Sequence, residues 1–257
     1  MENGKIKWQD LDQKPYVSPS TGQLRHSYSW VTESSRRMLT VSRDKLTALA
    51  GLMSQLAAAT GGTYAAGLWV EDLVLGLASH VPKSNNHLTQ RHDGRAPSWS
   101  WAALDAPVDW QCGEVKLTEY VSGPWMRHST RMGDLEILNV EVDEVHPGSF
   151  GEVRGGRITA MGTLYKAKKC LENLQRDTDG LGWPQLKCFF DEKQHTSTDG
   201  HADSPSPPKY FLLQLLKIDT GVTFLKRVHG SVAVFLIIQH MGSRHEFQRV
   251  GYAPYVR

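Results

Sequence analysis

The chain has 257 residues, of which 40% are hydrophobic and 22% are charged, as in ordinary folded domains. Its 29 basic and 27 acidic residues give a net charge of +2, which excludes a strong overall field for nucleic acid or an anionic membrane. The longest apolar run, residues 232–238, is far shorter than the ~20 residues that a membrane-spanning helix needs. Residues 1–5 lack the apolar core of a secretory signal. We therefore expect a cytoplasmic protein with no membrane and no nucleic-acid partner.

The first third of the chain is polar and then helical in pattern. Residues 1–25 form a polar N-terminal segment, and residues 26–81 form a helical region. Three helices are predicted there: one through Trp30 that ends near residue 39, one from an N-cap at Ser42 to Gly61, and one from about residue 67 to residue 80. In the second, apolar residues recur at spacings of three and four and make one apolar stripe.

Residues 82–257 have the pattern of a β-rich region. Apolar or alternating runs recur at 115–121, 135–145, 156–165, 187–190, 210–218, 231–239 and 246–252. We expect an α+β fold, in which a short N-terminal helical region precedes a mainly antiparallel β sandwich or partly closed barrel. The run 135–145 carries apolar groups on both faces, which predicts a central strand. Residues 191–208 are too polar to offset their ordering entropy, so we expect a disordered insertion.

Two indoles spaced two residues apart, Trp99 and Trp101, follow a polar stretch, residues 82–95, that is predicted to be an exposed loop. On an extended backbone they would share one face. Such a pair either anchors a core or forms a platform for a ligand, and the core interpretation is favoured because large aromatic side chains contribute most to cores. An alternative is a carbohydrate-binding module that also uses Trp110, although the chain shows no export signal.

The chain shows no motif of known catalytic chemistry. A nucleophile elbow, a phosphate-binding glycine loop and a Cys-x-x-Cys pair are all absent from the sequence. Glu71 and Asp72 form a carboxylate pair, but neighbouring helix positions diverge by about 100°, so the two cannot easily share a substrate. We therefore predict no catalytic residue, no metal site and no cofactor.

Arg36, Arg37 and Asp44 lie where the first predicted helix turns into the second. An arginine fork can hold a carboxylate or carbonyl oxygens at such a turn, so these residues are expected to make architectural contacts. A bound phosphate is the alternative. The candidate binding residues are Arg36, Arg37, Asp44, Trp69, Trp99 and Trp101.

Five segments between residues 26 and 110 occur in a recognisable order. They are Tyr28–Val31, Ser35–Thr40, Asp44–Leu52, Tyr64–Trp69 and Ala96–Ala102. In this order and spacing they resemble the segment that follows the heterokaryon-incompatibility (HET) domain in fungal HET-domain proteins. A weaker resemblance extends towards the end through Phe247–Gly251.

Members of this family begin with a tyrosine- and tryptophan-rich block and a later block that ends in an asparagine–glutamine pair. Residues 1–25 match neither block. The resemblance therefore implies a region downstream of the HET core, with the N-terminal HET blocks missing.

The family is implicated in non-self recognition and in programmed cell death when incompatible hyphae fuse. The resemblance implies a non-catalytic recognition or regulatory module with protein partners. HET domains also resemble, distantly, the Toll/interleukin-receptor fold, some of whose members cleave NAD. The alternative is therefore part of an NAD-cleaving enzyme whose catalytic N-terminal region is absent from this sequence.

Overall fold

The computed structural model describes residues 19–37, 39–82, 91–92, 94–112, 115–116, 130–132, 135–166, 189–190, 209–219, 231–242 and 245–256. The predicted insertion 191–208 and most of the loop before Arg91 lie outside these residues. In the described residues three α-helices, with one short hairpin before the third, precede the larger antiparallel β-sheets, so the predicted α+β order is confirmed. None of the described helices is long and apolar enough to cross a membrane.

The helical layer comprises α1 (Pro19–Ser35), the 3-10 helix η2 (Ser42–Lys45) and α2 (Thr47–Thr60). The first helix begins inside the segment 1–25, which was expected to be polar only. The second ends as predicted at Gly61, which takes a left-handed φ of 72° and donates its N–H to the carbonyl of Ala57.

The start of the third predicted helix is replaced by a hairpin. Strands β1 (Tyr64–Ala65) and β2 (Leu68–Trp69) pair antiparallel, and only then follow η3 (Val70–Asp72) and α3 (Leu73–Gly76). The reason is the two-residue turn at Ala66 and Gly67, both of which have positive φ, as a tight hairpin turn requires. A helix predicted from residue 67 is therefore wrong over its first turn.

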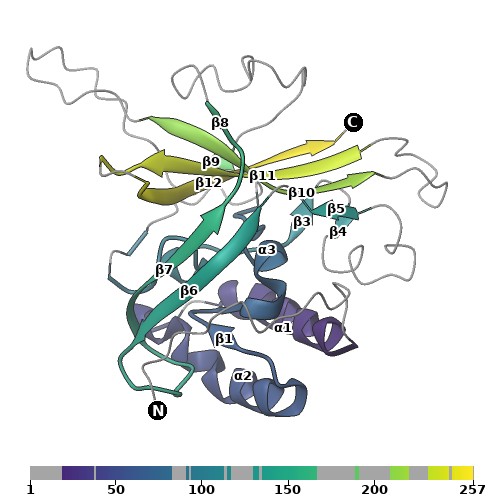
Figure 1. Cartoon of the computed structure of the whole chain (residues 1–257). Coiled ribbons are helices and arrows are strands. Elements are labelled where there is room, and N and C mark those ends of the chain that lie inside the picture. The colour runs from purple at the N-terminus through teal and green to yellow at the C-terminus, as the bar shows by residue number, and fades with distance from the viewer. Residues whose placement is uncertain are drawn as a thin grey trace, which may run out of the picture.

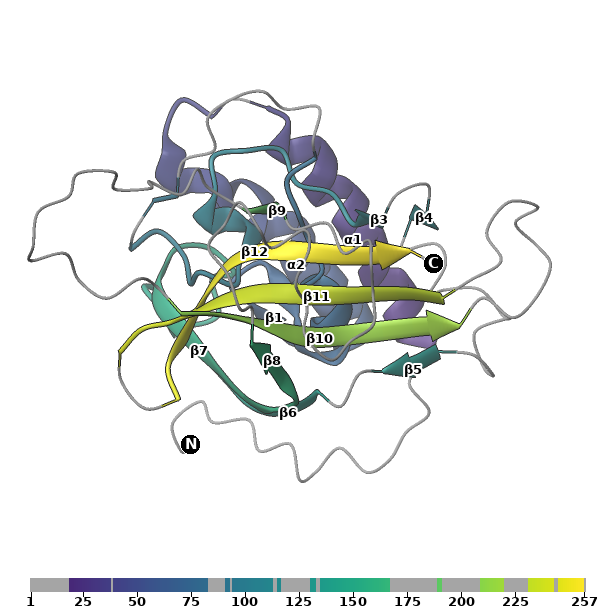
Figure 2. The same ribbon diagram turned by 90° about the horizontal axis from the view of Figure 1, so that it is seen from above.

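The main sheet has the order β5–β10–β11–β12–β9, with β8 paired to β10. Its strands are β5 (Thr130–Met132), β8 (Leu164–Lys166), β9 (Phe189–Phe190), β10 (Tyr210–Asp219), β11 (Ser231–His240) and β12 (Phe247–Val256). All pairings are antiparallel, and the described strands do not close into a barrel. The sheet lies above the helices in Figure 1, and Figure 2 shows β10, β11 and β12 running side by side across them.

One face of this sheet contributes to the same core as the helices. Leu215, Val234, Leu236 and Tyr252 are buried in a cluster with residues of α1, α2 and α3. The short strands β3 (Gln111–Cys112) and β4 (Val115–Lys116) pair with each other beside it. The arrangement therefore has a helical layer covered by an open sheet.

A second sheet consists of the long hairpin β6 (Glu136–Glu144) and β7 (Val153–Met161). Among the described residues β6 pairs with β7 alone, so the central strand predicted for 135–145 is wrong. The register shifts between Ile137 and Asn139, so one extra residue, Leu138, is inserted opposite β7. The bulge reverses the alternation of side chains after Leu138. Apolar residues before and after it, which strict alternation would place on opposite faces, therefore lie on the same buried face.

Strand β12 is fastened to the helical layer by Arg249. Its guanidinium donates to the carbonyls of Leu77 and Ser79 and to the Ser79 hydroxyl, beyond the end of α3. Arg91 in turn donates to the carbonyl of Arg249 over 3.0 Å. This network, in which Arg249 and Ser79 are buried, orients the last strand.

Candidate functional site

The tryptophan side chains singled out in the sequence are structural. The indole N–H of Trp101 donates to the carbonyl of Gly67 over 2.9 Å, and that of Trp69 donates to the Ser27 hydroxyl over 2.8 Å. Trp110 donates to the carbonyl of Gly76 and stacks on Tyr28 with ring centroids 4.6 Å apart. These hydrogen bonds explain how three large indoles are buried without losing their polar contacts.

Trp99 and Trp101 are both buried, with exposed fractions of 8% and 2%, but they pack against different elements. The backbone is not extended there, because Trp101 begins the 3-10 helix η4 (Trp101–Ala103) and the Ser100 hydroxyl caps it. Trp99 instead faces the hairpin: a Cβ on Gly156 of β7 would lie 3.1 Å from its ring. The two indoles therefore join the helices to the β-strands and form no surface platform.

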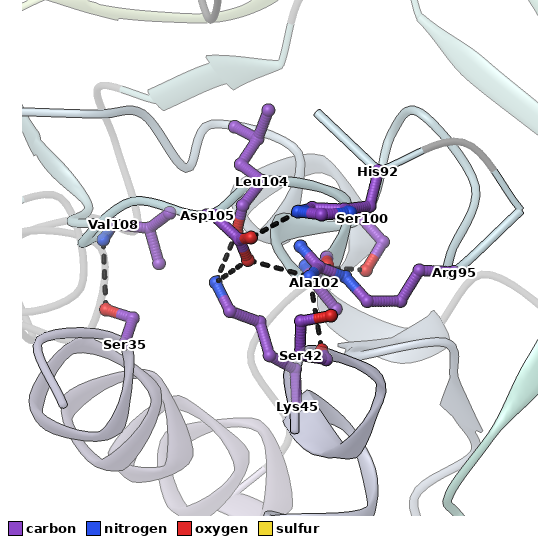
Figure 3. A network of polar contacts seen from close by, with 10 residues as sticks. All are labelled: Ser35, Ser42, Lys45, His92, Arg95, Ser100, Ala102, Leu104, Asp105 and Val108. Carbon is purple, nitrogen blue, oxygen red and sulfur yellow. Dashed lines mark hydrogen bonds and ion pairs between the residues drawn. The ribbon is translucent and has the colours of Figure 1, made fainter. Parts of the chain in front are cut away.

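The densest polar cluster is centred on Asp105, next to η4 (Figure 3). Its Oδ1 accepts from Arg95 Nη1 at 2.7 Å and lies 3.6 Å from Lys45 Nζ, while Oδ2 pairs with His92 Nε2. Lys45 and Arg95 are buried, whereas Asp105 and His92 each keep about 33% of their side chains exposed. Two buried cations and an imidazole thus share one carboxylate.

The same side chains also tie three chain segments together. Lys45 Nζ donates to the carbonyl of Leu104, and Arg95 Nε donates to that of Ala102 over 2.7 Å. Arg95 Nη1 reaches the carbonyl of Ser42 as well, over 3.1 Å. The cluster therefore connects η2 to the segment 95–105, which contains both indoles and η4.

Burial and neighbouring charges shift the pKa values of Lys45 and Asp105. Burial, reinforced by repulsion from Arg95, lowers the pKa of Lys45 to about 8 despite the attraction of Asp105. Burial alone would raise the pKa of Asp105, but the hydrogen bond and charge of Arg95, with help from Lys45, hold it below its ordinary value. At neutral pH the cluster therefore holds more positive than negative charge.

Lys45 should make stability depend on pH in a defined window. Its pKa is about 8 in the folded chain and 10.5 for the unperturbed group, so between these values the unfolded chain holds the proton and the folded chain releases it. Raising the pH there favours the folded state. We expect the free energy of unfolding to rise from pH 8 to 10 relative to that of Lys45→Met, with a slope on the order of 1 kcal/mol per pH unit.

Urea titrations at half-unit pH steps measure this difference. They stop at pH 10 because burial raises the pKa of Tyr28 and of Tyr64 in the folded chain. Above pH 10 these phenols would ionise first in the unfolded chain, so stability would fall with rising pH and mask the effect of Lys45. Lys209→Met, which removes an exposed lysine, is the matched control and should follow the parent. Parallel curves for the parent and Lys45→Met would show that Lys45 does not titrate in this window.

Arg36, Arg37 and Asp44 do not come together at the turn between the first two helices. Arg36 and Arg37 are exposed at the end of α1, at 3.9 Å and 3.8 Å from the Glu33 carboxylate. Asp44 is exposed on η2. The arginine that holds this turn is Arg95, which sequence reasoning missed because it is 53 residues away from its acceptor Ser42.

Glu71 and Asp72 diverge, as their spacing predicts. Asp72 is buried and accepts two hydrogen bonds from Arg25, at 2.7 Å and 3.0 Å. Burial raises the pKa of Asp72, and the hydrogen bonds and charge of Arg25 oppose that shift. Glu71 points elsewhere, since both of its carboxylate oxygens accept from the N–H of Thr63, at 2.9 Å and 3.0 Å.

Within the described part of the chain, no group of three or more His, Cys, Asp or Glu side chains is placed to hold a metal ion. The carboxylate pair considered in the sequence, Glu71 and Asp72, is engaged in contacts that hold the fold together. No family model, no curated protein and no solved structure matches this chain.

Proposed function

We propose that this chain is a non-catalytic recognition or regulatory module that works through protein partners in the cytoplasm. The resemblance to the region downstream of the HET core of fungal HET-domain proteins links it to non-self recognition and programmed cell death. The proposal concerns the described helical layer and sheets, where the family-like segments lie.

The observation that carries the proposal is that the chain's candidate acid–base and aromatic residues make hydrogen bonds to other residues of the fold. Asp72 is bound by Arg25, Glu71 is held by the Thr63 N–H, and Trp69 and Trp101 donate to core acceptors. A general acid or base must reach a substrate with a free proton or lone pair. Because these side chains already make hydrogen bonds within the fold, they favour the interpretation as a scaffold for recognition over that as a reaction centre.

Incubation of the purified chain with NAD tests the enzymatic alternative. We expect no release of nicotinamide above that of a buffer blank, measured by chromatography, because Asp72 is buried against Arg25 and Glu71 already accepts from the Thr63 N–H. Turnover that Glu71→Gln abolishes, while Glu33→Gln leaves it intact, would overturn the proposal and place an active site at η3. Glu33 is the matched control because its carboxylate is exposed on α1.

A further inference from the structure

A pocket of about 240 Å³ lies between the η3–α3 segment and the first residues of β6, two regions that can be located in Figure 1. Five apolar and two acidic residues line it: Val70, Leu73, Val74, Leu135, Ile137, Glu71 and Glu136. Neither the cluster around Asp105 nor the buried tryptophans contribute to it.

The size of the pocket limits what it can hold. Pockets for cofactors and drug-sized ligands usually measure about 300–1,000 Å³, so this one is suited to a single side chain. Val70, Leu73 and Val74 are buried, with exposed fractions of 4%, 2% and 4%, and form an apolar floor. An aliphatic chain would gain contact area there.

Both charged groups that line the pocket are carboxylates, and they come from different elements. Glu71 belongs to η3 and is held in place by the Thr63 N–H, whereas Glu136 begins β6 and is exposed. An ionised carboxylate has about four acceptor sites, so Glu71 keeps capacity for a second donor. Among the described residues, none that lines the pocket is basic, so none neutralises these charges.

An apolar floor with acidic groups on two sides complements a long aliphatic stem that ends in a cation. We propose that this pocket receives a lysine side chain of a protein partner. The four methylene groups would lie against the part-exposed Leu135 and Ile137, above the buried floor. The ammonium group, with its three donors, would face Glu71 and Glu136. This inference rests on the proposed function, since it names the chemistry of the protein partner.

Two capped amino acids of matched shape test the inference: N-acetyl-lysine N-methylamide and its uncharged counterpart, N-acetyl-norleucine N-methylamide. The methyl resonances of Val70, Val74 and Leu135 are followed by NMR as each probe is added to the full chain. We expect the lysine probe to shift all three and to saturate at millimolar concentration. The norleucine probe should bind about two- to fivefold more weakly, the effect of a solvent-exposed ion pair.

Three variants locate the binding. Glu71→Gln retains a carbonyl acceptor for the Thr63 N–H, and both it and Glu136→Gln should weaken the lysine probe about two- to fivefold without affecting the norleucine probe. Ile137→Phe should fill the pocket and abolish binding of both. Glu33→Gln removes a carboxylate outside the pocket and should bind like the parent.

Equal binding of the two probes, absence of shifts for both, or unchanged binding by Ile137→Phe would each overturn the inference. These outcomes are separate from failure of the proposed function, which is decided by nicotinamide release. Absence of NAD cleavage together with absence of probe shifts would refute the lysine pocket alone. NAD cleavage that Glu71→Gln abolishes and Glu33→Gln leaves intact would refute the proposed function whatever the probes do.

Discussion

Replacing Trp101 with alanine is expected to lower the free energy of unfolding by about 3–5 kcal/mol, a large part of the stability of an ordinary domain. The indole is 2% exposed, and its N–H is the donor to the carbonyl of Gly67. Alanine would leave a cavity between η4 and the β1–β2 hairpin and would also leave a buried carbonyl without its donor. Urea unfolding, followed by far-ultraviolet circular dichroism, measures the loss.

Trp30→Ala is the matched control, because it makes the same chemical change at a side chain that is 39% exposed on α1. Its unfolding midpoint should stay much closer to that of the parent. Trp101→Phe should lie between the two, since it retains an aromatic ring but removes the hydrogen bond. If Trp101→Ala and Trp30→Ala unfold at the same urea concentration, the indole of Trp101 does not anchor the core.

The second large effect is expected from Asp72→Ala, which removes the carboxylate that neutralises Arg25. Both side chains are at most 3% exposed, so the variant would take from a buried guanidinium the charge of Asp72 and the two hydrogen bonds that Asp72 accepts. Breaking a buried ion pair from one side costs about 3–5 kcal/mol. We expect a loss of this size in urea unfolding at pH 7.

The double variant Arg25→Met/Asp72→Leu separates charge from packing. It removes both charges and refills the space with apolar groups, so it should be clearly more stable than Asp72→Ala. Glu33→Ala breaks only the exposed contacts with Arg36 and Arg37 and should leave stability unchanged. A double variant as unstable as Asp72→Ala would mean that the pair matters through its shape, and that loss of the Asp72 charge is not the cause.

Several elements could be predicted because their signals are local. The stripe of apolar residues and Gly61 set the course and the end of α2. Runs of β-branched and aromatic residues likewise placed β10, β11 and β12 to within a few residues. The burial of Trp99 and Trp101 could be predicted from their size. The extended conformation predicted for them was wrong, because the Ser100 cap starts a 3-10 helix.

The candidate site shows what local signals cannot provide. Arg36 and Arg37 looked suited to hold the turn before α2, yet Glu33 is their nearest partner and solvent surrounds them. The turn is held instead by Arg95, through the carbonyl of Ser42. A sequence shows that an arginine is present, but only the folded chain decides which acceptor it meets and how much solvent remains around it.

The amino-acid sequence by itself determined that a helical region precedes the long strands, because side-chain periodicity, glycine conformations and β-propensity act over a few residues. The tertiary structure alone decided that Lys45, His92 and Arg95 meet at Asp105, and that Glu71 and Glu136 line one pocket. It also decided the single buried face of β6, through the bulge at Leu138. These features depend on contacts between distant segments, and their free energies arise only when folding removes water from between them.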